Sequence, residues 1–254
     1  MNLIRTAIPD ARQSKDLFLL QEACNQYDHI SLTLPLEEDC ICCLLYENER
    51  LLSALITFFT DSDTMECYGC TLPGERQKGH FTSLLKDLVN DYPDCDFIFP
   101  VYENCQDGLK ALQAMEASFC CKEHFMELSI SGSEKSNFLN ENKDGSGLTI
   151  SSLRNSGGFI CYEFLKDNAV VGKCSLDIQK NSAYLFGFEI SNPLRGQGLG
   201  TACLDLFLKT YVSLAGDQRK DIIYLQVSDE NPAAVSLYKK AGFHIRESLS
   251  YYLY

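Results

Sequence analysis

The sequence contains no long apolar run. Its longest apolar stretches, such as DIIYLQV and RLLSALITFF, are only as long as strands, whereas a membrane-spanning helix needs about 20 apolar residues. The N-terminus also lacks the basic region, apolar segment and cleavage site that together mark a secretory signal. We therefore expect a cytoplasmic protein that has no membrane partner.

Basic residues are scarce in the first half of the chain. Residues 1–130 carry 9 Lys and Arg against 22 Asp and Glu, a net of −13, while residues 131–254 carry 13 of each sign. Because nucleic acids and anionic membranes both require a basic face, we expect neither as a partner. The acidic half is compatible with a cationic small molecule, although an acidic surface that aids solubility explains the same charge.

Cysteine is abundant, yet neither a disulfide pattern nor a zinc pattern accompanies it. The chain has 13 cysteines, an odd number, and many lie in apolar runs such as CICCLLY, where thiols act as small hydrophobes. Cys67 and Cys70 form a CxxC, but no second CxxC or Cys/His pair follows at the spacing of a zinc finger. We expect free, mostly buried cysteines and no metal site.

The hydrophobic patterns of the chain occur in two similar series. The polar segment 131–147, rich in Ser, Asn and Gly, predicts a linker. The patterns before it predict a helix, a hairpin, a strand, a helix, a strand and a helix. Those after it predict the same order from the hairpin onward, followed by a closing strand or hairpin at 243–254. The sequence therefore predicts two copies of one α/β unit, in domains 1–130 and 148–254.

The junction between a strand and a helix repeats most clearly. LPGERQKGHF and NPLRGQGLG both place an arginine three positions before a glycine, as Arg76 with Gly79 and Arg195 with Gly198. A helix N-terminus presents free N–H groups and the positive end of the helix dipole, so glycines before it allow an anion to approach the backbone. A tight turn without a ligand is the other interpretation. Thr201 breaks the dinucleotide-binding GxGxxG, and the chain has no GK[ST] of a P-loop.

Two motifs together resemble the GNAT acyltransferase superfamily, whose members bind acetyl-CoA. The first is RGQGLG at 195–200, similar to the family's (Arg/Gln)-x-x-Gly-x-(Gly/Ala). The second is DENPAAVSLYKKAGF at 229–243, with Asn231, Tyr238 and Gly242 in the family's order. The resemblance covers residues 184–254 closely. It implies an α/β fold of two tandem acyl-CoA N-acyltransferase-like domains, each a mixed, mostly antiparallel sheet flanked by helices.

The resemblance also implies how acetyl-CoA is held. Backbone N–H groups of the turn would surround the pyrophosphate, and the strand before it would bind the pantetheine amides through its backbone. The residues implied to contact acetyl-CoA are Phe188, Ile190, Arg195, Gly196, Gln197, Gly198, Leu199, Gly200, Asn231 and Tyr238.

Acyl transfer to an amine needs a neutral nucleophile, a stabilised oxyanion and a proton for the leaving thiolate. Tyr238 is the candidate acid, and a tyrosine that only packs in the core is the alternative. Glu189 is the candidate base, acting through water, and a solvated glutamate at a strand end is the alternative. The resemblance implies a backbone N–H near Ile190 as the oxyanion donor.

The first copy departs from the family pattern. Phe81 stands in place of the last glycine of the motif, and Ala114 falls at the position of Tyr238 when both are counted back from the next phenylalanine. The second copy is in turn too short, ahead of its hairpin, for the two helices that form the acceptor floor in this family. We expect the first half, or a second subunit in a homo-oligomer, to complete that floor.

These observations favour an N-acetyltransferase that moves an acetyl group from acetyl-CoA directly to a primary amine in a ternary complex. The acceptor is a small-molecule or peptide amine. The alternative is a non-enzymatic acyl-CoA-binding or regulatory module with one degenerate copy.

Overall fold

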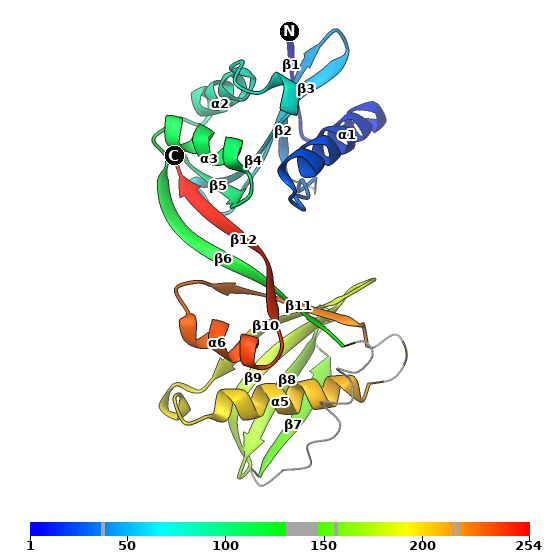
Figure 1. Cartoon of the computed structure of the whole chain (residues 1–254), viewed down its shortest axis with the longest axis vertical. Helices are drawn as coiled ribbons and strands as arrows, with labels where there is room; N and C mark the ends of the chain where they lie inside the picture. Colours follow the sequence, from blue (N-terminus) through cyan, green and yellow to red (C-terminus); the bar gives the residue numbers. More distant parts are fainter. Residues whose placement is uncertain (37–38, 131–146, 155–156, 215, 217–218) are drawn as a thin grey trace. The chain divides into compact units, whose positions relative to one another are not determined.

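The computed structural model describes residues 1–36, 39–130, 147–154, 157–214, 216 and 219–254 (Figure 1). The chain forms two compact units, the first made of Met1–Lys122 with Leu249–Tyr254 and the second of Glu123–Ser248. Apart from Gly147, the expected linker at 131–147 lies outside the described residues.

The first unit is built on a sheet in which only one neighbouring pair of strands is parallel. The strand order is β1-β2-β3-β4-β5-β12, and β4 and β5 are the parallel pair. The strands are β1 (Asn2–Thr6), β2 (Ile41–Glu47), β3 (Arg50–Phe59), β4 (Thr64–Thr71), β5 (Asp96–Tyr102) and the end of β12 (His244–Leu253).

Helices cover both faces of this sheet. They are α1 (Ala11–Asp28), the short 3₁₀ turn η1 (Pro73–Glu75), α2 (His80–Asp91) and α3 (Gln106–Ala114). A capping box of Asp10 and Gln13 starts α1, which buries Leu17 and Leu20 in one core. Helix α2 buries Leu84 in a second core, on the opposite face. Alternate residues of the central strands supply the two cores, as the two-residue period of a strand requires.

The second unit repeats this plan around a single core. Its strand order is β6-β11-β10-β9-β8-β7, and only β10 and β11 are parallel. The strands are β6 (Ser118–Ser129), β7 (Leu148–Arg154), β8 (Ile160–Lys166), β9 (Ala169–Ile178), β10 (Ala183–Ile190) and β11 (Ile222–Ser228). The turn η2 (Asn192–Leu194), α5 (Leu199–Val212) and α6 (Pro232–Lys240) complete it. Helix α5 buries Leu204, Phe207, Leu208 and Tyr211 in the core.

Two strands contribute residues to both units. Residues 123–129 of β6 pair antiparallel with β11 in the second unit, although they precede the other strands of that unit in the sequence. Residues 249–253 of β12 pair antiparallel with β5 in the first unit. Each unit therefore contains a strand segment from the other half of the chain.

The predicted α/β fold of two tandem units, each with a mixed, mostly antiparallel sheet flanked by helices, is confirmed. The 13 cysteines are free, and most are buried, as expected. Cys67 and Cys70 of the CxxC belong to cores on opposite faces of the first sheet, so their thiols do not converge. Among the described residues, no helix is long and apolar enough to cross a membrane.

Candidate active site

The glycine turn of the second unit follows the end of β10. A bulge lies between Phe186 and Glu189, and Gly187 within it has a φ of 61°. After η2, the Arg195 Nε donates a hydrogen bond of 2.9 Å to the Ile190 carbonyl. Because this hydrogen bond joins the Arg195 side chain to the last residue of β10, it holds the turn against the strand.

The turn exposes backbone N–H groups at the start of α5. Gly196 and Gly198 have φ values of 76° and 80°, which side chains other than glycine rarely adopt. The first helical hydrogen bond runs from the Ala202 N–H to the Gly198 carbonyl, so the N–H groups before residue 202 have no helical acceptor. A Cβ atom at Gly196 or Gly198 would meet nothing within 4 Å. This open helix N-terminus has the chemistry of an anion site.

The two parallel strands of the second unit separate beside this turn. Strand β10 pairs with β11 only at Ala183–Ile223 and Tyr184–Tyr224, while its pairing with β9 continues to Ile190. From Tyr184 to Ile190, the edge of β10 that faces β11 therefore diverges from its neighbour. Phe188 and Ile190 lie on this stretch, where an extended ligand could add to the strand edge.

Tyr238 lies next to the end of β10, on helix α6. The Asn231 side chain caps this helix by accepting a hydrogen bond of 3.1 Å from the Ala234 N–H. Tyr238 is only 7% exposed, and its ring makes edge contacts with Phe188 and Phe243 at centroid distances of 6.2 and 5.7 Å. Burial raises the pKa of Tyr238 to about 12. The phenol is therefore a neutral hydrogen-bond donor over the whole physiological range.

The remaining predicted residues lie around this centre. A Cβ at Gly200 would lie 3.6 Å from Leu237 on α6, so the start of α5 packs closely beside α6. The Gln197 Nε2 donates to the Pro193 carbonyl at 3.2 Å, and Leu199 is half-buried. Glu189 is exposed, and its Oε1 lies 3.1 Å from the Nζ of Lys173, the facing residue on β9. The structure thus gathers the turn, Phe188 and Tyr238, and places Glu189 in a surface ion pair.

The first unit contains the same turn with the same backbone conformation. After η1, the Arg76 Nε donates to the Thr71 carbonyl at 3.2 Å, as Arg195 does to Ile190. Gly79 has a φ of 81°, and Gln77 has a left-handed φ of 62°, where its counterpart Gly196 in the second copy has 76°. Strands β4 and β5 likewise pair only at their first residues, 64–66 with 96–98. The internal repeat therefore extends to single backbone angles.

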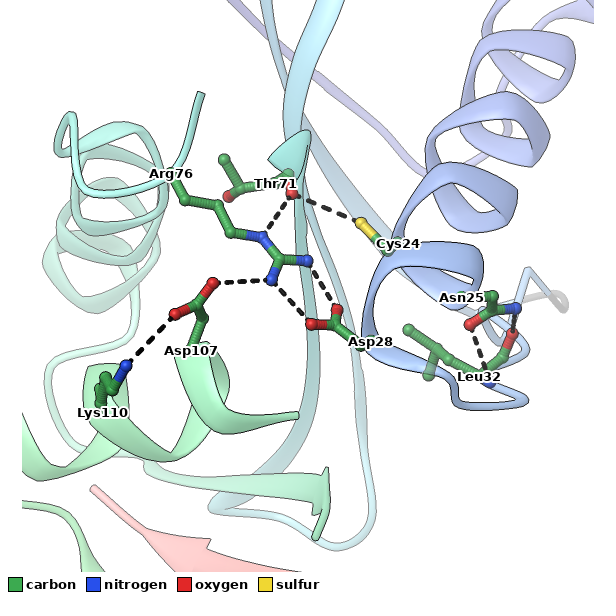
Figure 2. Close-up of polar contacts among 8 residues, drawn as sticks. All are labelled: Cys24, Asn25, Asp28, Leu32, Thr71, Arg76, Asp107 and Lys110. Atoms are coloured by element: carbon green, nitrogen blue, oxygen red, sulfur yellow. Dashed lines mark hydrogen bonds and ion pairs between the residues drawn. The ribbon is translucent and has the colours of Figure 1, made fainter. Parts of the chain in front are cut away.

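The arginine head group has different partners in the two copies (Figure 2). The Arg76 guanidinium makes two hydrogen bonds with Asp28, at 2.6 and 2.8 Å, and one with Asp107, at 3.0 Å. It also lies over the Tyr27 ring, 4.9 Å from the centroid. The Cys24 thiol donates to the same Thr71 carbonyl, at 3.4 Å. Arg195 is exposed. Arg76 is therefore a structural centre that ties α1, β4 and α3 together.

The position equivalent to Tyr238 in the first copy is Leu112, and its assignment to Ala114 is wrong. The Phe243 N–H donates to the Tyr238 carbonyl, and the Ala117 N–H makes the same hydrogen bond to the Leu112 carbonyl. Counting back from Phe119 misplaced the equivalence because Phe119 is an exposed residue of β6 rather than the counterpart of the buried Phe243. Leu112 has no hydroxyl, so the first copy still lacks a proton donor here.

Sequence patterns did not indicate the Asp28 and Asp107 partners of Arg76. They lie 48 and 31 residues from it, with no local spacing that joins the three. The only signal was Arg76 itself, an arginine at a turn. An arginine side chain that is removed from water requires carboxylate partners. Within the described residues, no group of three or more His, Cys, Asp or Glu side chains is arranged to hold a metal ion.

Comparison with known proteins gives a family match for the second unit and a fold match for the whole chain. The model of the Acetyltransferase (GNAT) family matches residues 123–243. A search of curated protein sequences gives no match. A solved structure of a GCN5-related N-acetyltransferase from Sphaerobacter thermophilus is similar with a TM-score of 0.74 and 13% identity, covering 99% of this chain and 95% of that chain.

Two further solved structures also match the whole chain. A tandem GNAT protein from the clavulanic acid biosynthesis pathway has a TM-score of 0.68 and 13% identity, covering 100% of this chain and 98% of that one. A glucosamine N-acetyltransferase region of a fungal multi-domain β-N-acetylglucosaminidase has a TM-score of 0.66 and 9% identity, covering 100% of this chain and 38% of that one. Residues 123–243 therefore match the GNAT acetyltransferase family, and the whole chain has the fold of a tandem GNAT protein.

Proposed function

We propose that the protein is an N-acetyltransferase that binds acetyl-CoA in its second unit and transfers the acetyl group directly to a primary amine. One observation carries the proposal: an open glycine turn at the N-terminus of α5 lies beside diverging parallel strands and the buried Tyr238. The turn suits the pyrophosphate, the free edge of β10 suits the pantetheine amides, and Tyr238 suits the sulfur.

In the proposed reaction, the neutral amine attacks the carbonyl carbon of the thioester in a ternary complex. The C–N bond forms, the C–S bond breaks, and the electron pair leaves with the sulfur. The Tyr238 phenol donates a hydrogen bond to this sulfur as its negative charge develops. Because the pKa of Tyr238 is raised to about 12, while an ordinary thiol has a pKa of about 8.5, hydrogen bonding contributes more than complete proton transfer.

We assign the proton of the attacking amine to Glu189, through a water molecule. The support is its place one residue before Ile190 at the end of β10, on the diverging stretch. Its carboxylate is exposed and pairs with Lys173 at the surface, where water and the acceptor can reach it. The backbone N–H of Ile190 is our candidate oxyanion donor.

The proposal is tested by measuring acetyl-CoA binding by calorimetry and the release of CoA thiol with a panel of amines. The panel comprises a polyamine, an aminoglycoside, free amino acids, a short peptide and glucosamine, the last because one structural neighbour carries a glucosamine N-acetyltransferase region. We expect binding of acetyl-CoA and thiol release with at least one amine. Binding without turnover on any amine would favour a non-enzymatic acyl-CoA-binding module, and absence of binding would reject the site.

A further inference from the structure

The first unit contains a cavity of about 660 Å³ at the place where β4 and β5 diverge. This volume is in the range of small-molecule sites. Its walls come from β4, β5, α1, α2 and α3, and they include the apolar side chains Ile30, Leu32, Phe81, Phe99, Leu112 and Met115. Asn25 fixes the loop after α1 through two hydrogen bonds with the Leu32 backbone, at 2.8 and 3.0 Å (Figure 2). These two bonds hold the loop that carries Ile30 and Leu32 of the cavity wall.

The polar end of this cavity differs in charge from the acetyl-CoA turn proposed in the second unit. Asp28 and Asp107 line the cavity beside Arg76, so two carboxylates face one guanidinium. At the N-terminus of α6, the residue in the place of Asp107 is Ala233, the second residue of the helix. In the described part of the second unit, no helix precedes β8 that could supply a counterpart of Asp28.

This charge distribution disfavours a phosphate ligand in the first unit. The guanidinium N–H groups that could bind a phosphate are occupied by the two carboxylates, and Asp28 is almost fully buried, with 5% of its side chain exposed. A pyrophosphate at the Gly79 turn would lie near two negative charges in a partly desolvated place, where their repulsion is strong. The surrounding sequence adds to this effect, since residues 1–130 carry a net charge of −13.

Asp107 remains available to a cation. Its Oδ2 accepts from Arg76, whereas its Oδ1 has, among the described residues, only the Lys110 ammonium as a charged partner, 3.8 Å away and on a side chain that is 68% exposed. An exposed pair at this distance contributes little, so a ligand ammonium can replace it. Asp107 is itself 27% exposed and lines the cavity.

We propose that the first unit holds a second ligand site, which takes a phosphate-free organic amine with an apolar body. The ammonium group binds Asp107 at the polar end, and the apolar body lies against the aromatic and aliphatic walls. This site is separate from the acetyl-CoA turn at residues 195–200, and it does not depend on the enzymatic function proposed above. It follows that the first unit binds no CoA.

The test uses three probes of equal length: octylamine, octanol and octanoate, added to the full chain without acetyl-CoA. Calorimetry should give the tightest binding for octylamine, about tenfold weaker binding for octanol, and still weaker binding for octanoate. A parallel titration with CoA should give no more than one site per chain. Octanoate binding as tightly as octylamine, no binding of octylamine, or two CoA molecules per chain would each overturn the proposal.

Variants locate the probe. Asp107→Asn keeps the size and the Arg76 hydrogen bond, and should weaken octylamine about tenfold while leaving octanol unchanged. Ala111→Trp fills the cavity and should abolish binding of both probes, whereas Gln113→Trp, exposed on the same helix, should not. The chain has no tryptophan, so each variant also reports its own folding by fluorescence. Unchanged octylamine binding in folded Ala111→Trp would place the probe elsewhere and reject the site.

Discussion

Gly198 and Gly79 occupy the same backbone conformation in the two copies, with φ values of 80° and 81° and open space around each. Gly198→Val should weaken acetyl-CoA binding by at least tenfold, because the side chain enters the space in front of the helix amides. Gly79→Val is the matched control, since it carries the same backbone strain. Calorimetry should show unchanged acetyl-CoA affinity for Gly79→Val. Equal losses in both variants would contradict a site confined to the second unit.

Tyr238 can be tested separately from binding. Tyr238→Phe keeps the ring between Phe188 and Phe243 and removes only the hydroxyl, so we expect kcat to fall about 10²-fold with little change in acetyl-CoA affinity. In the wild type, the raised pKa of about 12 predicts no loss of rate from tyrosine ionisation below about pH 10. Tyr211→Phe is the control, because that buried hydroxyl accepts from and donates to the Lys220 backbone, away from the proposed site. Undiminished turnover in Tyr238→Phe would make Tyr238 a packing residue.

Glu189 requires a pH profile rather than a single rate. Glu189→Gln should lower kcat/KM at every pH and change the shape of the profile, because the amide cannot accept the proton of the amine. Lys173→Gln, which removes the ion-pair partner, should retain the wild-type profile. The comparison is made by initial rates across pH 5 to 9 with saturating acetyl-CoA. An unaltered profile in Glu189→Gln would remove Glu189 from the mechanism.

At the scale of elements, both copies pack an aromatic ring at the junction between the strand and the helix. The helix supplies the ring in the first copy and the strand supplies it in the second. In the first copy, Phe81 at the start of α2 lies over Gly69 of β4, and a Cβ at Gly69 would be 2.6 Å from its ring. In the second copy, Phe188 on β10 supplies the ring, and Gly200 stands at the start of α5. The ring of Phe81 therefore packs where the ring of Phe188 packs in the second copy. Phe81 in place of the last glycine is no sign of degeneration by itself.

Arg76 joins three elements of the first unit, and its removal should loosen all three. Arg76→Leu leaves Asp28 buried and unpaired, so we expect a loss of about 3 kcal/mol in the stability of this unit. Hydrogen exchange should become faster in α1 and α3 and remain unchanged in α5. Arg195→Leu, whose head group is exposed, should cost only about 1 kcal/mol for the lost bond to Ile190. Equal effects would contradict a structural centre at Arg76.

The sequence predicted the local conformation of these elements but not the contacts between residues that are far apart in the chain. The turn at 195–200 was predictable because glycine spacing and the neighbouring hydrophobic periods fix its conformation within a few residues. The Asp28, Arg76 and Asp107 network was not, since burial and tertiary contact select those partners. For the same reason, counting in sequence selected Ala114, while the hydrogen-bond pattern selects Leu112.

At the scale of the whole molecule, the end of β12 completes the sheet of the first unit. Residues 249–253 pair with β5, and the Tyr254 N–H donates to the Phe97 carbonyl at 2.9 Å. Deleting residues 249–254 should therefore lower the melting temperature of the first unit and speed hydrogen exchange in β5, because that strand becomes an unpaired edge. Replacing the exposed Leu153 by Ser is a control for general surface effects. Unchanged exchange in β5 would contradict this pairing.

The series of elements was predictable in outline, but the exchange of strand segments was not. The patterns before the linker predicted no strand at β6, and nothing in the residues of β6 or β12 states which strand each of them pairs with. The pairing of β6 with β11 also bears on the expected domain boundaries. A fragment that starts at residue 148 would lack β6, the strand that pairs with β11.

The exchange of the last strand also orders events during protein synthesis. Domains made early in a chain usually fold while the ribosome is still adding the rest, at roughly 5–20 residues per second. Here the sheet of the first unit stays incomplete until residues 249–254 have left the ribosome, on the order of ten seconds after β5 has emerged. During that interval β5 offers an unpaired edge to other nascent chains. Aggregation of the protein would therefore begin on polysomes, where many nascent copies of this chain lie close together.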